Sequence, residues 1–143
     1  RNVSVKIKTF SKGKSPFTRH WPENKEFRGK LSKNGLSFFF DRLVGMSANR
    51  VVVAYGLNNK IVGYFRFSFS SVSKTINAKG TWVDPRYRRK NLAADLWTVA
   101  LRKFKPRKVS VFTVSRGGNR LIRSLEEKDY FKMIKWSHDS AVL

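Results

Sequence analysis

The sequence contains no cysteine, few acidic residues and no long apolar run. The absence of cysteine excludes disulfides, thiolate metal sites and a catalytic thiol. No apolar segment is long enough to cross a bilayer, so we expect no membrane span. No basic amphipathic helix with a broad apolar face stands out, so we expect no membrane partner. The two histidines, His20 and His138, lie far apart and have no partner at a ligand spacing, so we expect no metal site.

Acidic residues are scarce relative to basic ones. Lys and Arg number 31 against 9 Asp and Glu, which gives a formal net charge of +22. Such an excess destabilises a compact fold by self-repulsion unless a polyanion relieves it, and nucleic acid is the commonest polyanion. We therefore expect a nucleic-acid partner. The alternative interpretation of the charge is a solubilising surface or a source whose proteins are generally basic.

The length and composition predict one packed domain over residues 1–143. The chain is 41% hydrophobic and 14% aromatic, which is enough to form a core. It has no internal repeat and no linker, although the assignment is clearest after residue 49. No secretory signal pattern is present, so we expect a cytoplasmic protein, in a host cytoplasm if a phage or virus encodes it.

The first third of the chain gives a mixed pattern. Residues 3–10 alternate apolar and polar side chains, which predicts a strand. Residues 11–35 are polar and basic and predict a long irregular connection or a short helix. Residues 36–47 have helical spacing. The phenylalanine run at 38–40 is expected in the core, with a base-stacking platform as the alternative.

The middle of the chain predicts a β-meander. Residues 50–55 and 60–71 are apolar strands, and the turn-forming residues 56–59 join them into an antiparallel hairpin. Residues 76–83 form another strand, in which Gly80 indicates a bulge or a close backbone approach.

The last part of the chain alternates between helices and strands. Residues 92–104 carry apolar side chains on one helical face, and residues 108–114 alternate as a strand. We expect a short helix over 119–128 with Asn119 as its N-cap, followed by a strand over 129–138.

The segment from residue 83 to residue 93 is built to hold a phosphate. Pro85 ends the preceding strand, and the first turn of the following helix offers amide groups that have no intrahelical acceptor. Asn91 tolerates a left-handed conformation, and the small Ala93 would let a ligand approach the backbone. The loop between strand and helix adds four cations: Arg86, Arg88, Arg89 and Lys90.

This segment reads V-D-P-R-Y-R-R-K-N-L-A and closely resembles the acyl-CoA-binding motif of the GNAT superfamily of N-acetyltransferases. Arg88, Asn91 and Ala93 fall on the three fixed positions of that motif. The upstream run N-N-K-I-V-G-Y at residues 58–64 resembles the family's hairpin. The downstream run from Asn119 to Phe131 resembles its last motif, so the resemblance covers about residues 50–131.

The resemblance implies an α/β fold of the α+β kind: a mixed, mostly antiparallel sheet flanked by helices. The sheet would be splayed between the strands at 76–83 and 108–114, where the family binds acetyl-CoA or another acyl-CoA. The backbone near Trp82 and Val83 would polarise the acyl carbonyl. The implied cofactor-binding residues are Trp82, Val83, Arg88, Arg89, Lys90, Asn91, Leu92, Ala93 and Asn119.

The catalytic groups match the family less closely. Glu126 stands where the family often has a tyrosine acid, and a carboxyl can protonate a thiolate only where burial raises its pKa. Tyr130 lies four residues further on and is a substitute acid. Ser115 is a candidate to orient substrate or water. Asp84 is a possible base, although an Asx turn before Pro85 is the favoured interpretation.

Two functional hypotheses follow. The first is an acyl-CoA-dependent N-acyltransferase that modifies nucleic acid or an amine attached to it; the superfamily includes phage DNA-modifying enzymes and toxins that acetylate aminoacyl-tRNA. The second is a non-catalytic binding module or a basic subunit of a nucleoprotein or virion. Both use the same expected nucleic-acid contacts: Arg86, Arg102, Lys103, Lys105, Arg107 and Lys108. Four aromatic side chains could stack on bases, with packing as the favoured alternative: Trp21, Tyr87, Trp97 and Trp136.

Overall fold

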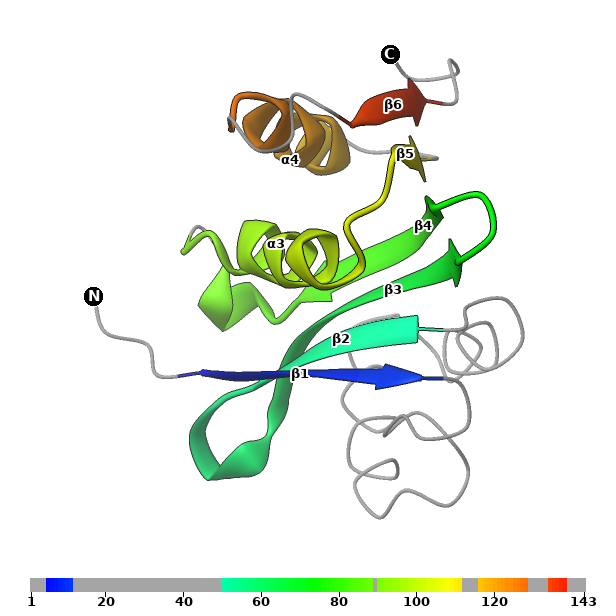
Figure 1. Cartoon of the computed structure of the whole chain (residues 1–143). Coiled ribbons are helices and arrows are strands. Elements are labelled where there is room, and N and C mark those ends of the chain that lie inside the picture. The colour runs from blue at the N-terminus through cyan, green and yellow to red at the C-terminus, as the bar shows by residue number, and fades with distance from the viewer. Residues whose placement is uncertain (1–4, 12–49, 89, 112–115, 129–133, 139–143) are drawn as a thin grey trace.

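The computed structural model describes residues 5–11, 50–88, 90–111, 116–128 and 134–138 of the chain. In this part the chain forms a six-stranded sheet with two α-helices (Figure 1). The strands are β1 (Lys6–Ser11), β2 (Arg50–Tyr55), β3 (Ile61–Ser70), β4 (Thr75–Val83), β5 (Lys108–Val111) and β6 (Lys135–His138). The helices are α3 (Leu92–Phe104) and α4 (Arg116–Glu126).

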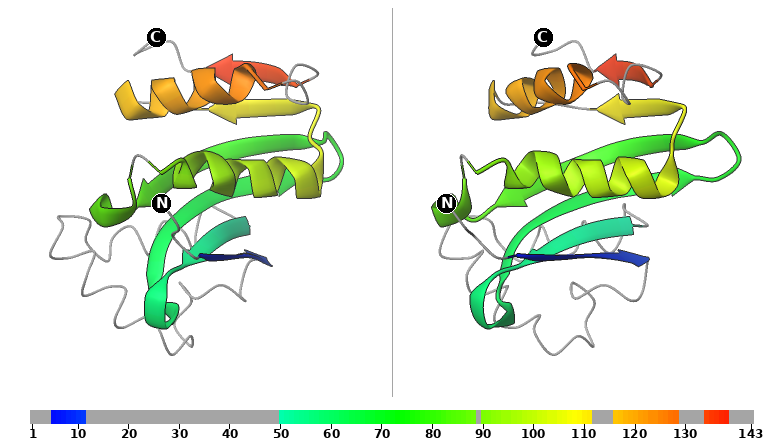
Figure 2. Two further views of the ribbon diagram at one scale, coloured as in Figure 1. Left: turned by 90° about the vertical axis from the view of Figure 1, so that its left-hand side faces the viewer. Right: turned by 60° about the vertical axis from the view of Figure 1, so that its left-hand side comes forward.

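The sheet is mixed, and its spatial order follows the chain from β1 to β6. Strands β1 to β4 pair antiparallel, whereas β4, β5 and β6 pair parallel. The parallel connections pass through α3 and α4. Both helices cover the same face of the sheet, as the two views of Figure 2 show. The expected mixed α/β fold is therefore confirmed.

The helix-covered face contains the main core. Helix α3 buries Leu96 and Trp97 against the sheet, and the Trp97 ring stacks on Phe65 of β3 at 4.2 Å between centroids. The Trp97 indole also donates to the Thr81 hydroxyl of β4 at 2.8 Å. Base stacking by Trp97 is thus wrong, because its ring is only 3% exposed. The same core includes Ile122 of α4, so both helices share it.

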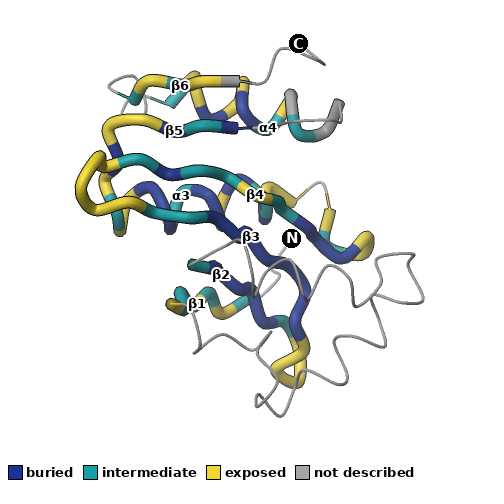
Figure 3. Tube along the Cα trace, turned by 90° about the vertical axis from the view of Figure 1, so that its right-hand side faces the viewer, coloured by how far each residue is buried: buried dark blue, intermediate teal, exposed yellow. Residues whose placement is uncertain are grey.

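The opposite face of the sheet is apolar as well. Val51 and Val53 of β2 lie in a second buried cluster with Tyr64 and Trp82, whose rings stack at 6.0 Å. Strand β2 is therefore buried on both faces, as its continuous apolar sequence predicts. The dark blue course of β2 and β3 in Figure 3 shows this burial.

A buried arginine lies beside the bulge at Gly80. The β3–β4 register shifts between Arg66 and Phe67, which confirms the expected bulge. A Cβ at Gly80 would lie 3.0 Å from the Arg66 Nε, so the glycine makes room for this guanidinium. Burial lowers the pKa of Arg66, and the neighbouring Tyr64 partly opposes that shift.

Several sequence predictions need correction or lie outside the described residues. Helix α4 begins at Arg116, so Asn119 lies inside the helix and is not its N-cap. Two glycines precede Asn119 and indicated a loop, but a first helical turn tolerates them because most of its amides bond nothing within the helix. The predicted helix at 36–47 falls outside the described residues. No described helix is long and apolar enough to span a membrane.

Candidate functional site

The loop between β4 and α3 begins with a buried carboxylate. Asp84 accepts a hydrogen bond from the backbone N–H of Arg86 at 2.9 Å and caps a short 3-10 turn over Pro85–Tyr87. The Arg86 guanidinium adds an ion pair at 3.4 Å, and this contact raises the pKa of Arg86. The Asx turn favoured from the sequence is therefore present. Asp84 shapes the loop, and its engaged carboxylate is a poor candidate for a general base.

Helix α3 starts from a left-handed residue. Asn91 has φ 62° and ψ 18°, and its side chain makes no capping hydrogen bond. The first helical bond within α3 runs from the Asp95 N–H to the Asn91 carbonyl at 2.9 Å. The amides of residues 92–94 therefore lack intrahelical acceptors and point along the axis at the positive end of the helix dipole. This is the geometry of an anion site, as the sequence predicts.

Two described cations flank these amides. Arg88 is exposed, and its Nε donates to the Val83 carbonyl at 2.8 Å. This bond fixes the guanidinium next to the end of β4. Lys90 is also exposed and lies 6.0 Å from the centre of the Tyr87 ring. Arg89 lies outside the described residues. A phosphate at the start of α3 would meet backbone dipoles and these two positive side chains.

Tyr87 anchors the loop to the β2–β3 hairpin. Its hydroxyl lies so close to Gly56 that a Cβ at that position would be 2.7 Å away. The same Cβ would be 2.9 Å from a Val62 methyl group, so only glycine fits between the two side chains. The hairpin motif and the phosphate loop, which lie far apart in the sequence, are thus packed against each other.

The end of β4 directs backbone groups away from β3. The Asp84 N–H bonds the Val62 carbonyl at 2.8 Å, so the facing residues Gly63 and Val83 form a non-hydrogen-bonded pair. The Val83 N–H and carbonyl therefore point toward the β5 side. The described β4–β5 pairing extends to Ala78 and Val111, and residues 112–115, over which the expected splay would open, lie outside the described residues. The Val83 N–H faces this side of the sheet, so it is a candidate donor to an acyl carbonyl.

The other predicted cofactor residues act mainly through the fold. The Trp82 ring is buried on the face opposite α3, so only its backbone can reach the site. Leu92 is buried in the core, and Ala93 is half-buried at the start of α3. Gly56 and Gly63 act as positioning residues because they leave space for their neighbours. A Cβ at Gly63 would approach the Trp82 carbonyl to 3.1 Å. The hairpin motif at residues 58–64 contains Gly63 but not Gly56.

The candidate catalytic residues are not brought together by the described structure. Glu126 is exposed in the last turn of α4, so the burial that its proposed role as an acid requires is not observed. Ser115 and Tyr130 fall outside the described residues. The structure therefore supports the binding loop more strongly than it supports any acid or base.

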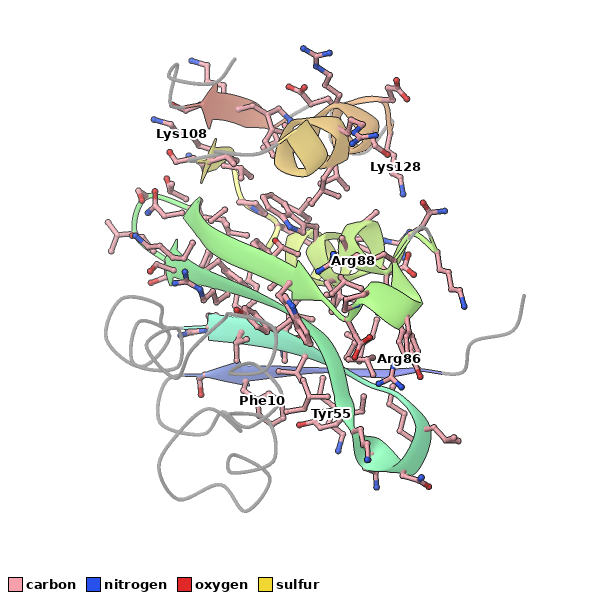
Figure 4. All side chains as sticks on the ribbon, turned by 180° about the vertical axis from the view of Figure 1, so that it is seen from behind. Phe10, Tyr55, Arg86, Arg88, Lys108 and Lys128 are labelled. Atoms are coloured by element: carbon pink, nitrogen blue, oxygen red, sulfur yellow. The ribbon has the colours of Figure 1, made fainter. Side chains whose placement is uncertain are left out.

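The predicted nucleic-acid contacts separate into two groups. Arg86 lies at the phosphate-loop end of β4, whereas Lys108 pairs with Thr75 at the other end of that strand. Figure 4 shows Arg86 and Arg88 together, far from Lys108. The remaining predicted cations lie in the last turn of α3 or in the loop that joins it to β5, on the Lys108 side: Arg102, Lys103, Lys105 and Arg107. Sequence order concealed this separation, because α3 crosses the domain between the two groups.

Comparison with known proteins identifies the family. The model of the acetyltransferase (GNAT) family matches residues 14–128. The chain belongs to the GNAT acetyltransferase family. No curated protein matches the chain. The fold is similar to the GNAT family acetyltransferase SP0256 from Streptococcus pneumoniae TIGR4, with TM-score 0.63, 16% identity, and 87% of this chain and 88% of that chain covered.

Two further GNAT structures are similar over nearly their whole length. The ribosomal-protein-alanine N-acetyltransferase from Brucella melitensis biovar Abortus 2308 has TM-score 0.56 and 16% identity, with 87% of this chain and 89% of that chain covered. The aminoglycoside N-acetyltransferase AAC(6')-Iy in complex with CoA has TM-score 0.55 and 13% identity, with 90% and 91% covered. At these identities the structures support the fold.

As a GNAT family member, the protein is an N-acetyltransferase that uses an acyl-CoA donor. The structure fits that donor independently. Asn91 in its left-handed conformation leaves the start of α3 without a side-chain cap, Arg88 and Lys90 supply charge, and the Val83 amide points away from β3. Residues 83–93 would therefore hold the pyrophosphate and direct the thioester toward the end of β4.

Proposed function

We propose that the protein transfers an acetyl group from acetyl-CoA to an amine that belongs to a nucleic acid or is attached to one. The observation that carries this proposal is the net charge of +22. In the described part of the chain only four residues are acidic: Asp84, Asp95, Glu126 and Glu127. A neutral or cationic acceptor gains nothing from such a surface, whereas a polyanion is attracted to it and relieves its self-repulsion.

The acyl-CoA family site supports a direct transfer. A bound acyl-CoA supplies the thioester. The deprotonated acceptor nitrogen forms the new C–N bond to the acyl carbon, the C–S bond breaks, and the proton that the nitrogen loses ends on the leaving sulfur. The Val83 N–H, which points away from β3, would stabilise the negative charge that develops on the acyl oxygen. The groups that move the proton stay predictions: Glu126, Tyr130 and Ser115.

The amide array at the start of α3 is the chain's main contribution to binding the donor. It is fixed before the donor arrives, because the fold already holds Asn91 in its left-handed conformation and Tyr87 against Gly56. Because this backbone is ordered before the donor arrives, binding the donor costs less conformational entropy. Arg88, which is held by its bond to the Val83 carbonyl, and Lys90 then add positive charge.

The proposal is tested by incubating the full chain with radiolabelled acetyl-CoA and separate acceptor pools. The pools are total tRNA, aminoacyl-tRNA, duplex DNA, ribosomal proteins and an aminoglycoside. We expect label in a nucleic-acid pool or in an amine attached to it, and loss of that label in an Ala93→Glu variant. Transfer only to the aminoglycoside or to free ribosomal proteins would contradict the proposed acceptor while leaving the family activity intact.

A further inference from the structure

Three parallel strands begin side by side at the end of the sheet opposite the phosphate loop. Thr75 of β4 pairs with Lys108 of β5, and Lys108 pairs with Lys135 of β6. Because β4, β5 and β6 run in the same direction, their first residues lie side by side at one end of the sheet. The loops that lead into these strands bring further cations. We call the whole set the basic edge: Lys74, Lys105, Arg107, Lys108 and Lys135.

Backbone hydrogen bonds fix the basic edge. The Arg107 N–H donates to the Lys74 carbonyl at 2.8 Å, which ties the α3–β5 loop to the β3–β4 turn. The Lys135 N–H donates to the Arg107 carbonyl at 3.0 Å, which ties the start of β6 to the same loop. Segments that are about 30 residues apart in sequence are thus held in one row. The main chain presents the cations whether or not a ligand is bound.

The charges of the basic edge are uncompensated within the described structure. All five side chains are exposed. Lys108 and Lys135 stand directly opposite each other on neighbouring strands, an arrangement that is unfavourable for like charges. In the described ranges none of the five forms an ion pair. An anion between the two strands would turn this repulsion into attraction.

Two lysines occupy positions that favour other residues. Lys74 has φ 55°, and Lys105 has φ 46° and ψ 58° as the C-cap of α3. Glycine or asparagine adopts this left-handed region with less strain, and glycine is the usual residue after a helix. The dipole of α3 accounts for Arg102 and Lys103 in its last turn, but it does not account for a strained lysine backbone. The positive side chains are present at a conformational cost.

We infer that the basic edge binds the sugar-phosphate backbone of a nucleic acid, at a site separate from the acyl-CoA site. This inference rests on the proposed function and adds the surface that holds the acceptor. Helix α3 has 13 residues and separates the two ends by about 20 Å. At this distance the bound nucleic acid leaves the start of α3 free for the donor. Contacts to the sugar-phosphate backbone position the nucleic acid but do not read its sequence.

The local surface favours nucleic acid over an anionic membrane. Val72 in the β3–β4 turn is the large hydrophobic side chain that this end exposes in the described structure, at 94%. A single apolar side chain does not provide the broad apolar face with which basic elements insert into a lipid interface. A row of lysines with little apolar surface suits a phosphodiester backbone, where binding comes from counterion release.

The first experiment compares two double variants that lose the same charge. Lys108→Gln with Lys135→Gln removes the like-charged pair, and Lys6→Gln with Lys79→Gln removes two exposed strand lysines elsewhere. Fluorescence anisotropy measures binding to a labelled duplex DNA and a labelled single-stranded RNA over a range of salt. We expect the basic-edge variant to lower the slope of log Kd against log salt by about two, and the control to leave it unchanged.

The second experiment separates a binding role from a structural one. Lys74→Asn and Lys105→Gly suit the left-handed backbone, so we expect an equal or higher melting temperature together with weaker nucleic-acid binding. Acetyl-CoA affinity should stay at the wild-type value in all these variants. Weaker acetyl-CoA binding in them would show that the two sites are not separate and would overturn the inference.

The outcomes distinguish the failure of this inference from the failure of the proposed function. If wild type binds nucleic acid and the basic-edge variants bind it equally well, the basic edge is not the binding surface, but the proposed nucleic-acid acceptor is not contradicted. Equal weakening in the control pair would also overturn it. If wild type binds neither DNA nor RNA at low salt, both fail. Binding of anionic phospholipid vesicles that depends on Lys108 and Lys135, with nucleic-acid binding unaffected, would assign the edge to membranes.

Discussion

The two ends of helix α3 offer positive charge in different ways. At its start, unpaired backbone amides and a left-handed Asn91 form a concentrated site that the fold has already ordered. At its end, the left-handed Lys105 joins other exposed cations, and three parallel strands set the backbone positions of this group. The first end suits one small pyrophosphate, and the second suits a repeating polyanion. The kind of anion that each end suits therefore depends on the backbone that holds the positive groups as well as on their charge.

The largest expected effect concerns the start of α3. Ala93→Glu places a carboxylate among the amides that would hold the pyrophosphate. We expect acetyl-CoA affinity to fall at least about 100-fold, or about 2.8 kcal/mol, measured by isothermal titration calorimetry. The melting temperature should not fall, because an acid in a first helical turn interacts favourably with the dipole.

The matched control for this change is Ala93→Gln, which adds similar bulk without charge. We expect an intermediate loss of acetyl-CoA affinity, and we expect both variants to bind nucleic acid as wild type does. Normal acyl-CoA turnover by Ala93→Glu would place the donor elsewhere. Loss of nucleic-acid binding by the same variant would show that the two ends of α3 share one ligand.

The next effect concerns the support beneath the loop. Gly56→Ala adds a methyl group 2.7 Å from the Tyr87 hydroxyl. We expect overpacking to cost about 1–3 kcal/mol in the free energy of unfolding and to raise the KM for acetyl-CoA by displacing Tyr87. Chemical denaturation and steady-state kinetics measure the two effects. Leu57→Ala in the same turn is the control, because Leu57 is 78% exposed; equal effects from both variants would count against the packing argument.

A smaller effect tests the side chain that reaches the end of β4. Arg88→Lys keeps the charge but removes the Nε donor that bonds the Val83 carbonyl at 2.8 Å. The loss of one such bond is worth about 1 kcal/mol, so we expect the KM for acetyl-CoA to rise about fivefold with little change in stability. Steady-state kinetics with a fixed acceptor checks this. A KM equal to that of wild type would mean that only the charge of Arg88 matters.

The smallest expected effect on binding concerns the middle of α3. Trp97→Phe removes the hydrogen bond to Thr81 and some buried surface, so we expect a lower melting temperature. Nucleic-acid affinity should not change, because the Trp97 ring is buried against Phe65 between the two ends. Anisotropy with the labelled DNA checks this, and a marked loss of affinity at a temperature where the variant is folded would return Trp97 to a base-stacking role.

Local patterns in the sequence predicted the phosphate-loop end well. The strand that ends before Pro85, the left-handed Asn91 and the helix that follows are all encoded within about ten consecutive residues, and the structure confirms them. The bulge at Gly80 was also indicated locally, although the buried Arg66, for which this glycine leaves room, lies on another strand.

The basic edge could not be predicted in the same way. Lys74 and Lys135 join Lys108 only because β4, β5 and β6 are parallel neighbours, and no pattern within one segment specifies that pairing. For Arg86 the sequence misleads in the opposite direction. The sequence grouped Arg86 with the other predicted cations, but α3 runs between them, so Arg86 lies at the opposite end of the domain. The Asn119 N-cap failed because glycines that usually indicate a loop form the first turn of α4.

The most direct test of the account is calorimetric titration of wild type with acetyl-CoA, alone and after saturation with the DNA duplex. Two separate sites predict saturable 1:1 binding of acetyl-CoA with the same Kd, within about twofold, in both titrations. Competition between the two ligands, or acetyl-CoA binding no stronger than that of inorganic polyphosphate, would contradict the account.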